Sequence, residues 1–312
     1  MATEAIIDVS VPSQVARGEG PFRATRTLAT VADYWALTKP EINFLIAIAT
    51  FAGFYLARPS GPHEFPFLLL IHTLFGTLLV ASGTGTLNQY IERRFDAQMR
   101  RTARRPLAAG RIVPSSALWF GIALSVAGAF CLAATTNILA SLLAVATLAG
   151  YIFLYTPLKR ITPFSTLVGA IPGAMPPLIG STAASGRLGS EAWVLYLILF
   201  LWQFPHFMAI AWMYREDYER AGYLVLPRGY SRDRIASLQT ILPLLLLVLA
   251  TLLPTVWRES SLLYLVGALF LSLSFLYFGM RFVLHKSVAS ARRLLAASIL
   301  YLPLLLALRM VP

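Results

Sequence analysis

Charged residues and cysteine are both scarce in this chain. Only 13% of its 312 residues are charged and 57% are hydrophobic, a balance that excludes an ordinary soluble globular domain. The one cysteine, Cys131, excludes a disulfide or a thiolate metal site within the chain. Acidic residues are the rarer charge, 14 against 26 Lys and Arg, which gives a formal net charge of +12.

Apolar runs of about 20 residues, long enough to cross a bilayer, recur to the end of the chain. Because lipid offers no hydrogen bonds to the backbone, only helices or closed barrels can span it. The runs do not alternate with period two, which favours helices. We therefore expect an all-α polytopic membrane protein with nine spans, at about 41–58, 65–90, 115–134, 137–157, 164–183, 191–213, 236–257, 260–282 and 293–311.

The domain division follows from the same pattern. Residues 1–33 are polar and unpatterned, so we expect a flexible cytoplasmic arm, followed by an amphipathic approach at 32–38. Residues 34–312 are expected to form a single transmembrane domain.

Basic residues predict the orientation of these spans. With an internal N-terminus, 22 of the 26 Lys and Arg fall on the cytoplasmic side, and the other face has Arg58, Arg187, Arg258 and Arg309. The arginines border apolar helices, so a nucleic-acid partner is not expected. The pattern predicts that the charged centres face the cytoplasm, and the expected location is the bacterial cytoplasmic (inner) membrane.

The main polar interruption runs through residues 88–114. Asn88, Glu92 and Asp96 recur every fourth residue, so on a helix they form one polar stripe. Such groups at the mouth of a membrane helix are costly unless they hold something. Mg²⁺ prefers carboxylate oxygens and often binds substrate phosphates, and the forked donors of Arg101 and Arg105 suit phosphate. The stripe predicts a metal-bridged diphosphate site; ion pairs at an interfacial helix end are the alternative.

A second charged centre follows the sixth span as the first follows the second. It covers residues 214–222, in which Asp217 is the candidate metal-facing carboxylate. Before the other cytoplasmic connection, Tyr151 and Tyr155 lie four residues apart, one turn from Lys159 and Arg160. These four are either an aromatic belt with basic anchors or a site in which aromatic faces meet an allylic cation and basic groups meet diphosphate.

Two further features lie inside predicted spans. Gln203 and His206 are one turn apart beside Pro205, and polar groups there are expensive enough to suggest ligand binding. His206 could ligate iron, bind a carboxylate, or cap a neighbouring helix. The fifth span has six Gly and Pro residues between 169 and 180, which predicts a bent helix that either lines a cavity or allows a tight helix crossing.

Four sequence blocks carry a family resemblance. They are Asn88-x3-Glu92-x3-Asp96; Asp96-x2-Met99-x-Arg101-Thr102-x2-Arg105-Pro106-Leu107; Tyr155-Thr156-x2-Lys159-Arg160-x-Thr162-Pro163; and Trp202 to Phe207, ending in Asp217-Tyr218-x2-Ala221-Gly222. In these blocks the chain resembles the UbiA-type superfamily of intramembrane aromatic prenyltransferases. The second and fourth blocks are similar to the branch that farnesylates haem.

The resemblance implies a helical bundle around a central cavity and a Mg²⁺-dependent reaction. A farnesyl group would pass from farnesyl diphosphate to a vinyl group of haem B, giving haem O and diphosphate. The implied roles are Mg²⁺ binding by Asn88, Glu92, Asp96 and Asp217, charge balance by Arg101, Arg105, Lys159 and Arg160, and substrate contact by Tyr151, Tyr155, Gln203 and His206.

The expected partners are the two substrates and the lipid bilayer, with haem A synthase or terminal oxidase assembly factors as further candidates. Three alternatives stay open. They are another acceptor such as a quinone precursor, a membrane transporter that uses the charged centres as an anion gate, and a silent assembly partner of an oxidase.

Overall fold

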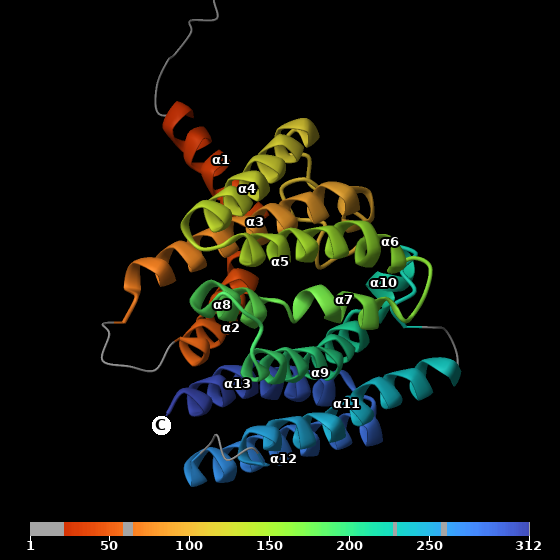
Figure 1. Ribbon diagram of the computed structural model, residues 1–312. Helices are drawn as coiled ribbons and strands as arrows, with labels where there is room; N and C mark the ends of the chain where they lie inside the picture. The colour runs from red at the N-terminus through yellow and green to blue at the C-terminus, as the bar shows by residue number, and fades with distance from the viewer. Residues whose placement is uncertain (1–21, 59–64, 227–229, 257–260, 312) are drawn as a thin grey trace, which may run out of the picture.

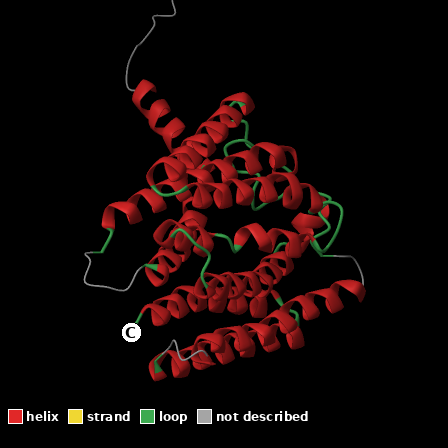
Figure 2. Cartoon of the chain, viewed as in Figure 1, coloured by secondary structure: helices red, strands yellow, loops and turns green. Residues whose placement is uncertain are grey.

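The computed structural model describes residues 22–58, 65–226, 230–256 and 261–311, and in these ranges the regular structure is entirely helical (Figure 2). The helices are α1 Phe22–Leu37, α2 Pro40–Ala57, α3 Phe67–Asp96, α4 Pro114–Thr135, α5 Ile138–Ala149, the π-helical turn Gly150–Tyr155, α6 Thr156–Leu158, α7 Ser165–Gly173, α8 Pro176–Ser185, α9 Ser190–Met213, α10 Arg215–Arg220, α11 Tyr230–Val256, α12 Leu262–His285 and α13 Val288–Met310. The prediction of an all-α fold is confirmed.

Within the described ranges, nine helical stretches are long and apolar enough to cross a membrane, as predicted. Helix α3 continues six residues past the expected end and so carries the polar stripe on the same helix as the span. The approach expected at 32–38 belongs to a longer helix, α1, which already begins at Phe22. Residues 1–21 of the predicted arm lie outside the described residues.

Three layers make up the bundle. In Figure 1, α11, α12 and α13 lie at the bottom, α3, α4 and α5 lie at the top, and α2, α7, α8 and α9 run between them. Helices α2 and α8 are in backbone contact: a Cβ at Gly53 would overlap Pro177, and one at Gly180 would overlap Thr50. Small residues allow this close approach without lipid between the helices.

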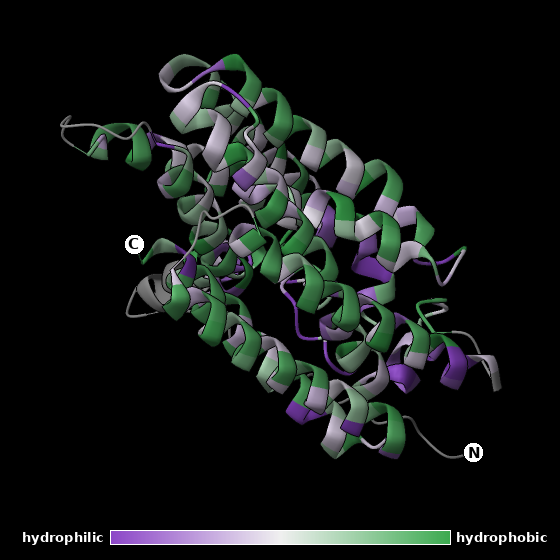
Figure 3. Cartoon of the chain, turned by 60° about the horizontal axis from the view of Figure 1, so that its bottom comes forward, coloured by the Kyte–Doolittle hydropathy of each residue, from purple (hydrophilic) through white to green (hydrophobic). Residues whose placement is uncertain are grey.

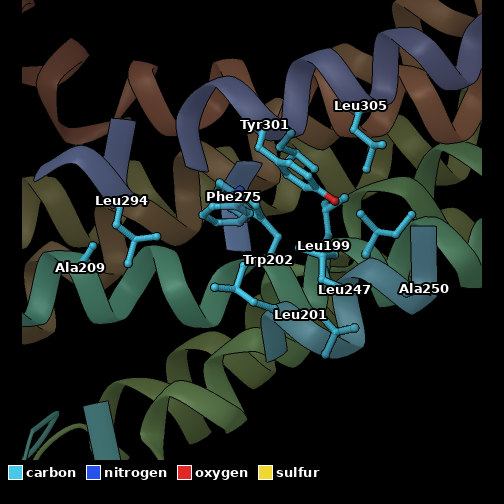
Figure 4. Packing of buried hydrophobic residues seen from close by; sticks show 14 of the residues in the cluster. Leu199, Leu201, Trp202, Ala209, Leu247, Ala250, Phe275, Leu294, Tyr301 and Leu305 are labelled. Carbon is cyan, nitrogen blue, oxygen red and sulfur yellow. The ribbon is translucent and has the colours of Figure 1, made fainter. Parts of the chain in front are cut away.

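The largest apolar core lies among α9, α11, α12 and α13. Trp202, Phe275 and Tyr301 form its centre together with leucines of α9, α11 and α13 (Figure 4). Such packing replaces the hydrophobic effect as the main cohesive force between helices in lipid. The C-terminal helices therefore form a firm wall on one side of the bundle.

The fifth span is broken, as its glycines and prolines predict. Helix α7 ends at Gly173 and α8 starts at Pro176. Gly173 leaves room for a neighbour, because a Cβ there would overlap the amide oxygen of Gln203 on α9. In Figure 3 most of the larger hydrophilic segments gather toward one end of the bundle, while the remaining helix surface is mainly hydrophobic.

Candidate functional site

The polar stripe of α3 faces the interior of the bundle. Asn88, Glu92 and Asp96 keep 1%, 5% and 1% of their surface exposed. Their spacing of four residues places them on one helical face, and the small residues Ser82 to Thr86 precede them on the same helix. Two carboxyl groups are therefore buried at the polar end of a span, where partners are needed to offset desolvation.

A cationic side chain meets each member of the stripe. Lys159 Nζ lies 2.8 Å from Glu92 Oε1, and Arg105 Nη1 lies 2.8 Å from Asp96 Oδ2. Lys39 Nζ donates to Asn88 Oδ1 at 2.8 Å, and the Asn88 amide donates to Thr156 Oγ1 at 3.3 Å.

These cations reach the stripe from three separate segments. Lys39 precedes α2, Arg105 lies in the loop after α3, and Lys159 follows α6. The stripe therefore joins three parts of the chain that are far apart in sequence.

The pKa values of Lys39 and Lys159 are shifted in opposite directions. Burial and, to a smaller extent, the nearby Arg105 guanidinium lower the pKa of Lys39 to about 7. Burial also opposes the charge of Lys159, but the adjacent Glu92 carboxylate raises the pKa of Lys159 well above its usual value. Positive charge thus exceeds negative charge around the stripe, as a site for a strongly anionic ligand requires.

The loop after α3 joins the first centre to the second. Thr102 Oγ1 donates to the Asp96 carbonyl oxygen at 2.9 Å, which folds the loop back over the end of α3. The Arg101 amide then donates to Asp217 Oδ2 at 3.2 Å, and Arg220 Nη1 lies 3.0 Å from Asp217 Oδ1. Asp217 is buried, with 6% of its surface exposed, so both predicted carboxylate centres belong to one connected site.

Aromatic rings border this site. Tyr151 and Tyr155 meet edge to face with ring centroids 4.9 Å apart, and Lys159 Nζ lies 4.5 Å above the Tyr155 ring. Arg160 Cζ lies 4.2 Å above the ring of Phe95. A pair of electron-rich ring faces beside a buried cation can also stabilise positive charge on a ligand.

Arg101 lies mainly against two tyrosines, Tyr214 immediately before α10 and Tyr218 within it. Its Nη2 donates to the Tyr218 hydroxyl at 3.2 Å, and its Cζ lies 5.0 Å from the ring centroid of Tyr214. The Arg101 side chain is exposed, unlike that of Arg105. Of the two arginines predicted to bind phosphate, Arg105 is thus the one that contacts the stripe.

The protein side chains alone do not complete a metal site, so a bound ligand would have to supply further oxygen donors. Within the described ranges, no group of three His, Cys, Asp or Glu side chains converges as a metal site. However, Asp96 Oδ1 is buried and makes no hydrogen bond, although Oδ2 of the same carboxylate has a partner. An orphaned carboxylate oxygen is the group that Mg²⁺ takes, and Mg²⁺ normally completes its shell with water and phosphate oxygens.

Gln203 and His206 do not form a common site, although both were predicted as substrate contacts. The Gln203 amide donates to the Ala170 carbonyl of α7 at 3.1 Å. His206 instead stacks on Trp202 and its Nδ1 lies 2.8 Å from Ser298 Oγ on α13. Among the described residues, neither side chain forms a hydrogen bond or an ion pair with Glu92 or Asp96.

Sequence reasoning missed two residues of the site. The sequence leaves Lys39 either as a marker of the membrane interface or as a substrate contact, and in the structure its ammonium donates to Asn88 Oδ1. Its backbone adopts the left-handed conformation, φ 54°, which turns the chain into α2. The signal for it was a lysine at the inner mouth of a span. The only sequence signal for Tyr218 was its position next to Asp217. In the structure the Tyr218 hydroxyl joins the site because it accepts a hydrogen bond from Arg101 Nη2.

Comparisons with known proteins agree with this arrangement. Residues 46–302 match the family model described as the UbiA prenyltransferase family. The chain is 50% identical over 279 residues to a protoheme IX farnesyltransferase of Solibacter usitatus, covering 88% of this chain and 96% of that protein. It is 44% identical to the protoheme IX farnesyltransferase of Salinibacter ruber, covering 89% and 98%.

Two solved structures share the fold at low sequence identity. A structure of digeranylgeranylglyceryl phosphate synthase superposes with a TM-score of 0.71 at 17% identity, covering 90% of this chain and 97% of that one. A UbiA homologue of Archaeoglobus fulgidus, bound to DMAPP and Mg²⁺, gives 0.61 at 15% identity, covering 90% and 100%. With a family match over most of its length and relatives of this identity, the chain belongs to the UbiA prenyltransferase family.

Proposed function

We propose that this membrane enzyme transfers the farnesyl group of farnesyl diphosphate to a vinyl group of haem B, giving haem O. The observation that carries the diphosphate half of the proposal is the buried stripe of α3, with Lys39, Arg105 and Lys159 around it. The acceptor half is supported by the relatives named protoheme IX farnesyltransferase, which match nearly the whole chain.

Charge balance is the first task of the site. Breaking the C1–O bond of farnesyl diphosphate leaves an electron pair and additional negative charge on the diphosphate. Arg105 and Lys159 lie where they can offset that charge, and Lys39 can add a third donor. When bound by Asp96, Glu92, Asn88 and Asp217, Mg²⁺ would supply Lewis-acid neutralisation of the diphosphate, as the bound Mg²⁺ of the Archaeoglobus fulgidus homologue suggests.

The second task is to guide the farnesyl cation. The edge-to-face rings of Tyr151 and Tyr155 offer electron density to positive carbon, and Lys159 limits how far the cation can drift towards them. The vinyl group of haem B then forms a C–C bond with farnesyl C1, which leaves a cation next to the porphyrin. Water adds a hydroxyl there and loses a proton, so the product carries a hydroxyethylfarnesyl arm. The apolar helices exclude water until that step.

Haem contact is proposed for Gln203 and His206, through iron or a propionate for His206. Both residues lie on α9, whereas the stripe lies on α3, so haem B and the diphosphate would be held by different helices. The Ser298 hydroxyl beside His206 Nδ1 would orient the ring and leave Nε2 for the ligand.

The orientation and the inner-membrane location are part of the proposal. They are supported by the concentration of Lys and Arg on the side of the stripe. Arg258, one of the four basic residues expected outside, lies outside the described residues. Single cysteines at Ala109→Cys and Arg187→Cys in a Cys131→Ser background test the orientation. In intact spheroplasts, an impermeant maleimide is expected to label only the second; labelling only the first would reverse it.

Product analysis tests the reaction. Purified full-length chain is incubated with haem B, farnesyl diphosphate and Mg²⁺, and pigments are identified by mass spectrometry. We expect a haem whose mass has increased by one farnesyl group and one hydroxyl. Prenylation of a quinone precursor such as 4-hydroxybenzoate, with haem B unchanged, would replace the acceptor, and diphosphate flux into liposomes without prenylated product would replace the enzyme by a transporter.

A further inference from the structure

A cavity of about 370 Å³ opens where α12 turns into α13. None of its lining residues belongs to the candidate active site. Aromatic and basic side chains dominate the lining, which includes Tyr277, Phe278, Arg281, His285, Ser290 and Arg293.

The turn that shapes this cavity is held in place by two neighbouring helices. Lys286 adopts the left-handed conformation, φ 45°, and ends α12. Its carbonyl oxygen accepts a hydrogen bond from Trp212 Nε1 of α9 at 3.0 Å, and its Nζ lies 3.0 Å from Asp233 Oδ2 of α11. Reciprocal hydrogen bonds between Ser287 and Ser290 then cap α13. A turn with these supports presents a fixed surface.

The cavity has positive charge that the described chain does not balance. Asp233, the acid at this turn, is already paired with Lys286. Arg281, His285 and Arg293 are exposed and have no ion pair within the described ranges. The N-terminal end of α13 adds a partial positive charge. These unpaired basic groups therefore favour an anionic ligand in the cavity.

The polarity of the cavity along α12 matches a lipid. Tyr277, Arg281 and His285 are spaced by four residues, so they follow one face of the helix. Tyr277 lies within the span, and the basic residues Arg281 and His285 lie at its C-terminal end. A phospholipid has the same order, with acyl chains inside the bilayer and a phosphate at its surface, whereas free phosphate would leave the aromatic end without a role.

We propose that this cavity binds the phosphate of an anionic phospholipid, with Arg281 and Arg293 as its main donors and Tyr277 against the glycerol and upper acyl chain. Guanidinium groups suit phosphate oxygens because two N–H donors can bind at once. The cavity lies on the face that holds most of the Lys and Arg, and in the proposed orientation this is the leaflet that faces the cytoplasm. The lipid would brace the α12–α13 hairpin against α9 and α11.

Lipid titration of the full-length chain tests the proposal. Protein in a neutral detergent is titrated with dioleoylphosphatidylglycerol or dioleoylphosphatidylcholine, and bound lipid is counted by native mass spectrometry. We expect saturable binding of one phosphatidylglycerol, and about tenfold weaker binding in the double variant Arg281→Gln with Arg293→Gln. The double variant Arg234→Gln with Arg292→Gln loses the same charge from exposed positions outside the cavity and is expected to bind as the wild type does.

Three outcomes would overturn the proposal. Equal losses in both double variants would mean diffuse attraction rather than a site. Equal binding of the two lipids would mean that the site does not distinguish an anionic headgroup from a zwitterionic one. Displacement of phosphatidylglycerol by millimolar inorganic phosphate would assign the cavity to the free anion. Farnesyl diphosphate binding and the unfolding temperature, measured in the same samples, show that each variant is folded, and neither readout depends on haem farnesylation.

Discussion

Two buried polar clusters of this protein differ in whether they are complete. In the C-terminal helices, the Tyr264 hydroxyl donates to the Thr251 carbonyl at 2.9 Å, and the Ser272 hydroxyl lies 3.2 Å from both Thr251 Oγ1 and the Tyr301 hydroxyl. All four groups are neutral and each has a partner. On α3, by contrast, two carboxylates pair with Arg105 and Lys159, while Asp96 Oδ1 has no partner.

The contrast separates a structural network from a binding site. A closed neutral network inside a membrane bundle joins helices at low cost. A charged cluster with an orphaned oxygen is costly by itself and becomes favourable when a ligand completes it. The first therefore accounts for cohesion of α11, α12 and α13, and the second is the proposed binding site.

The largest expected effect comes from Asp96→Asn. The change removes the anionic oxygen that has no protein partner, so we expect prenyl transfer to fall by about 100- to 1000-fold while the protein still folds. Haem O yield from the purified variant measures it. Ser272→Ala in the neutral network is the control and should keep its activity, and wild-type yield from Asp96→Asn would remove the stripe from the mechanism.

Lys159→Gln should mainly affect stability. It leaves the Glu92 carboxylate buried without its ion pair, which costs about 3 kcal/mol or more. Unfolding in mixed micelles measures the loss. Adding Glu92→Gln to the same chain should recover most of it, because both charges are then absent; a double variant as unstable as the single one would show that the pair is not coupled.

Gly173→Ala tests the close packing of α7 against α9. The new methyl group would overlap the Gln203 amide oxygen, so we expect a loss of about 1 to 3 kcal/mol in unfolding free energy. Gly150→Ala is a matched control, since a Cβ there lies 3.8 Å from Pro172, an ordinary contact. Equal stability of the two variants would contradict the close α7–α9 packing.

The smallest expected changes in stability concern His206. Ser298→Ala removes only its hydrogen-bond partner and should cost about 1 kcal/mol. His206→Ala should weaken haem binding by about tenfold and leave farnesyl diphosphate binding unchanged. Spectroscopic haem titration distinguishes the two variants, and unchanged haem affinity in His206→Ala would leave that residue a purely structural role at the α9–α13 contact.

Much of the fold was predictable because lipid imposes simple rules. Length and hydropathy located the nine spans, and the Gly and Pro residues between 169 and 180 predicted a bend in the fifth span, which is interrupted after Gly173. The four-residue spacing of Asn88, Glu92 and Asp96 predicted their common buried face. Each of these inferences uses local sequence only.

The missing parts depend on contacts between distant segments. No local pattern shows that Lys39 reaches Asn88, 49 residues away, or that the Arg101 amide meets Asp217, 116 residues away. Gln203 and His206 are three residues apart, which suggests a shared face, but α7 and α13 lie on different sides of α9 and each takes one of them. Helix neighbours, unlike helix spans, are set by tertiary packing.

In this account the α3 stripe binds Mg²⁺, and the Mg²⁺ binds the diphosphate of the substrate. The most direct measurement is the affinity of a non-reactive farnesyl thiodiphosphate for the wild type and for Asp96→Asn, with Mg²⁺ and after exhaustive chelation. We predict that Mg²⁺ strengthens wild-type binding by about tenfold or more and has little effect on the variant. Equal wild-type affinity in both conditions would contradict the claim and leave Lys39, Arg105 and Lys159 to bind the diphosphate alone.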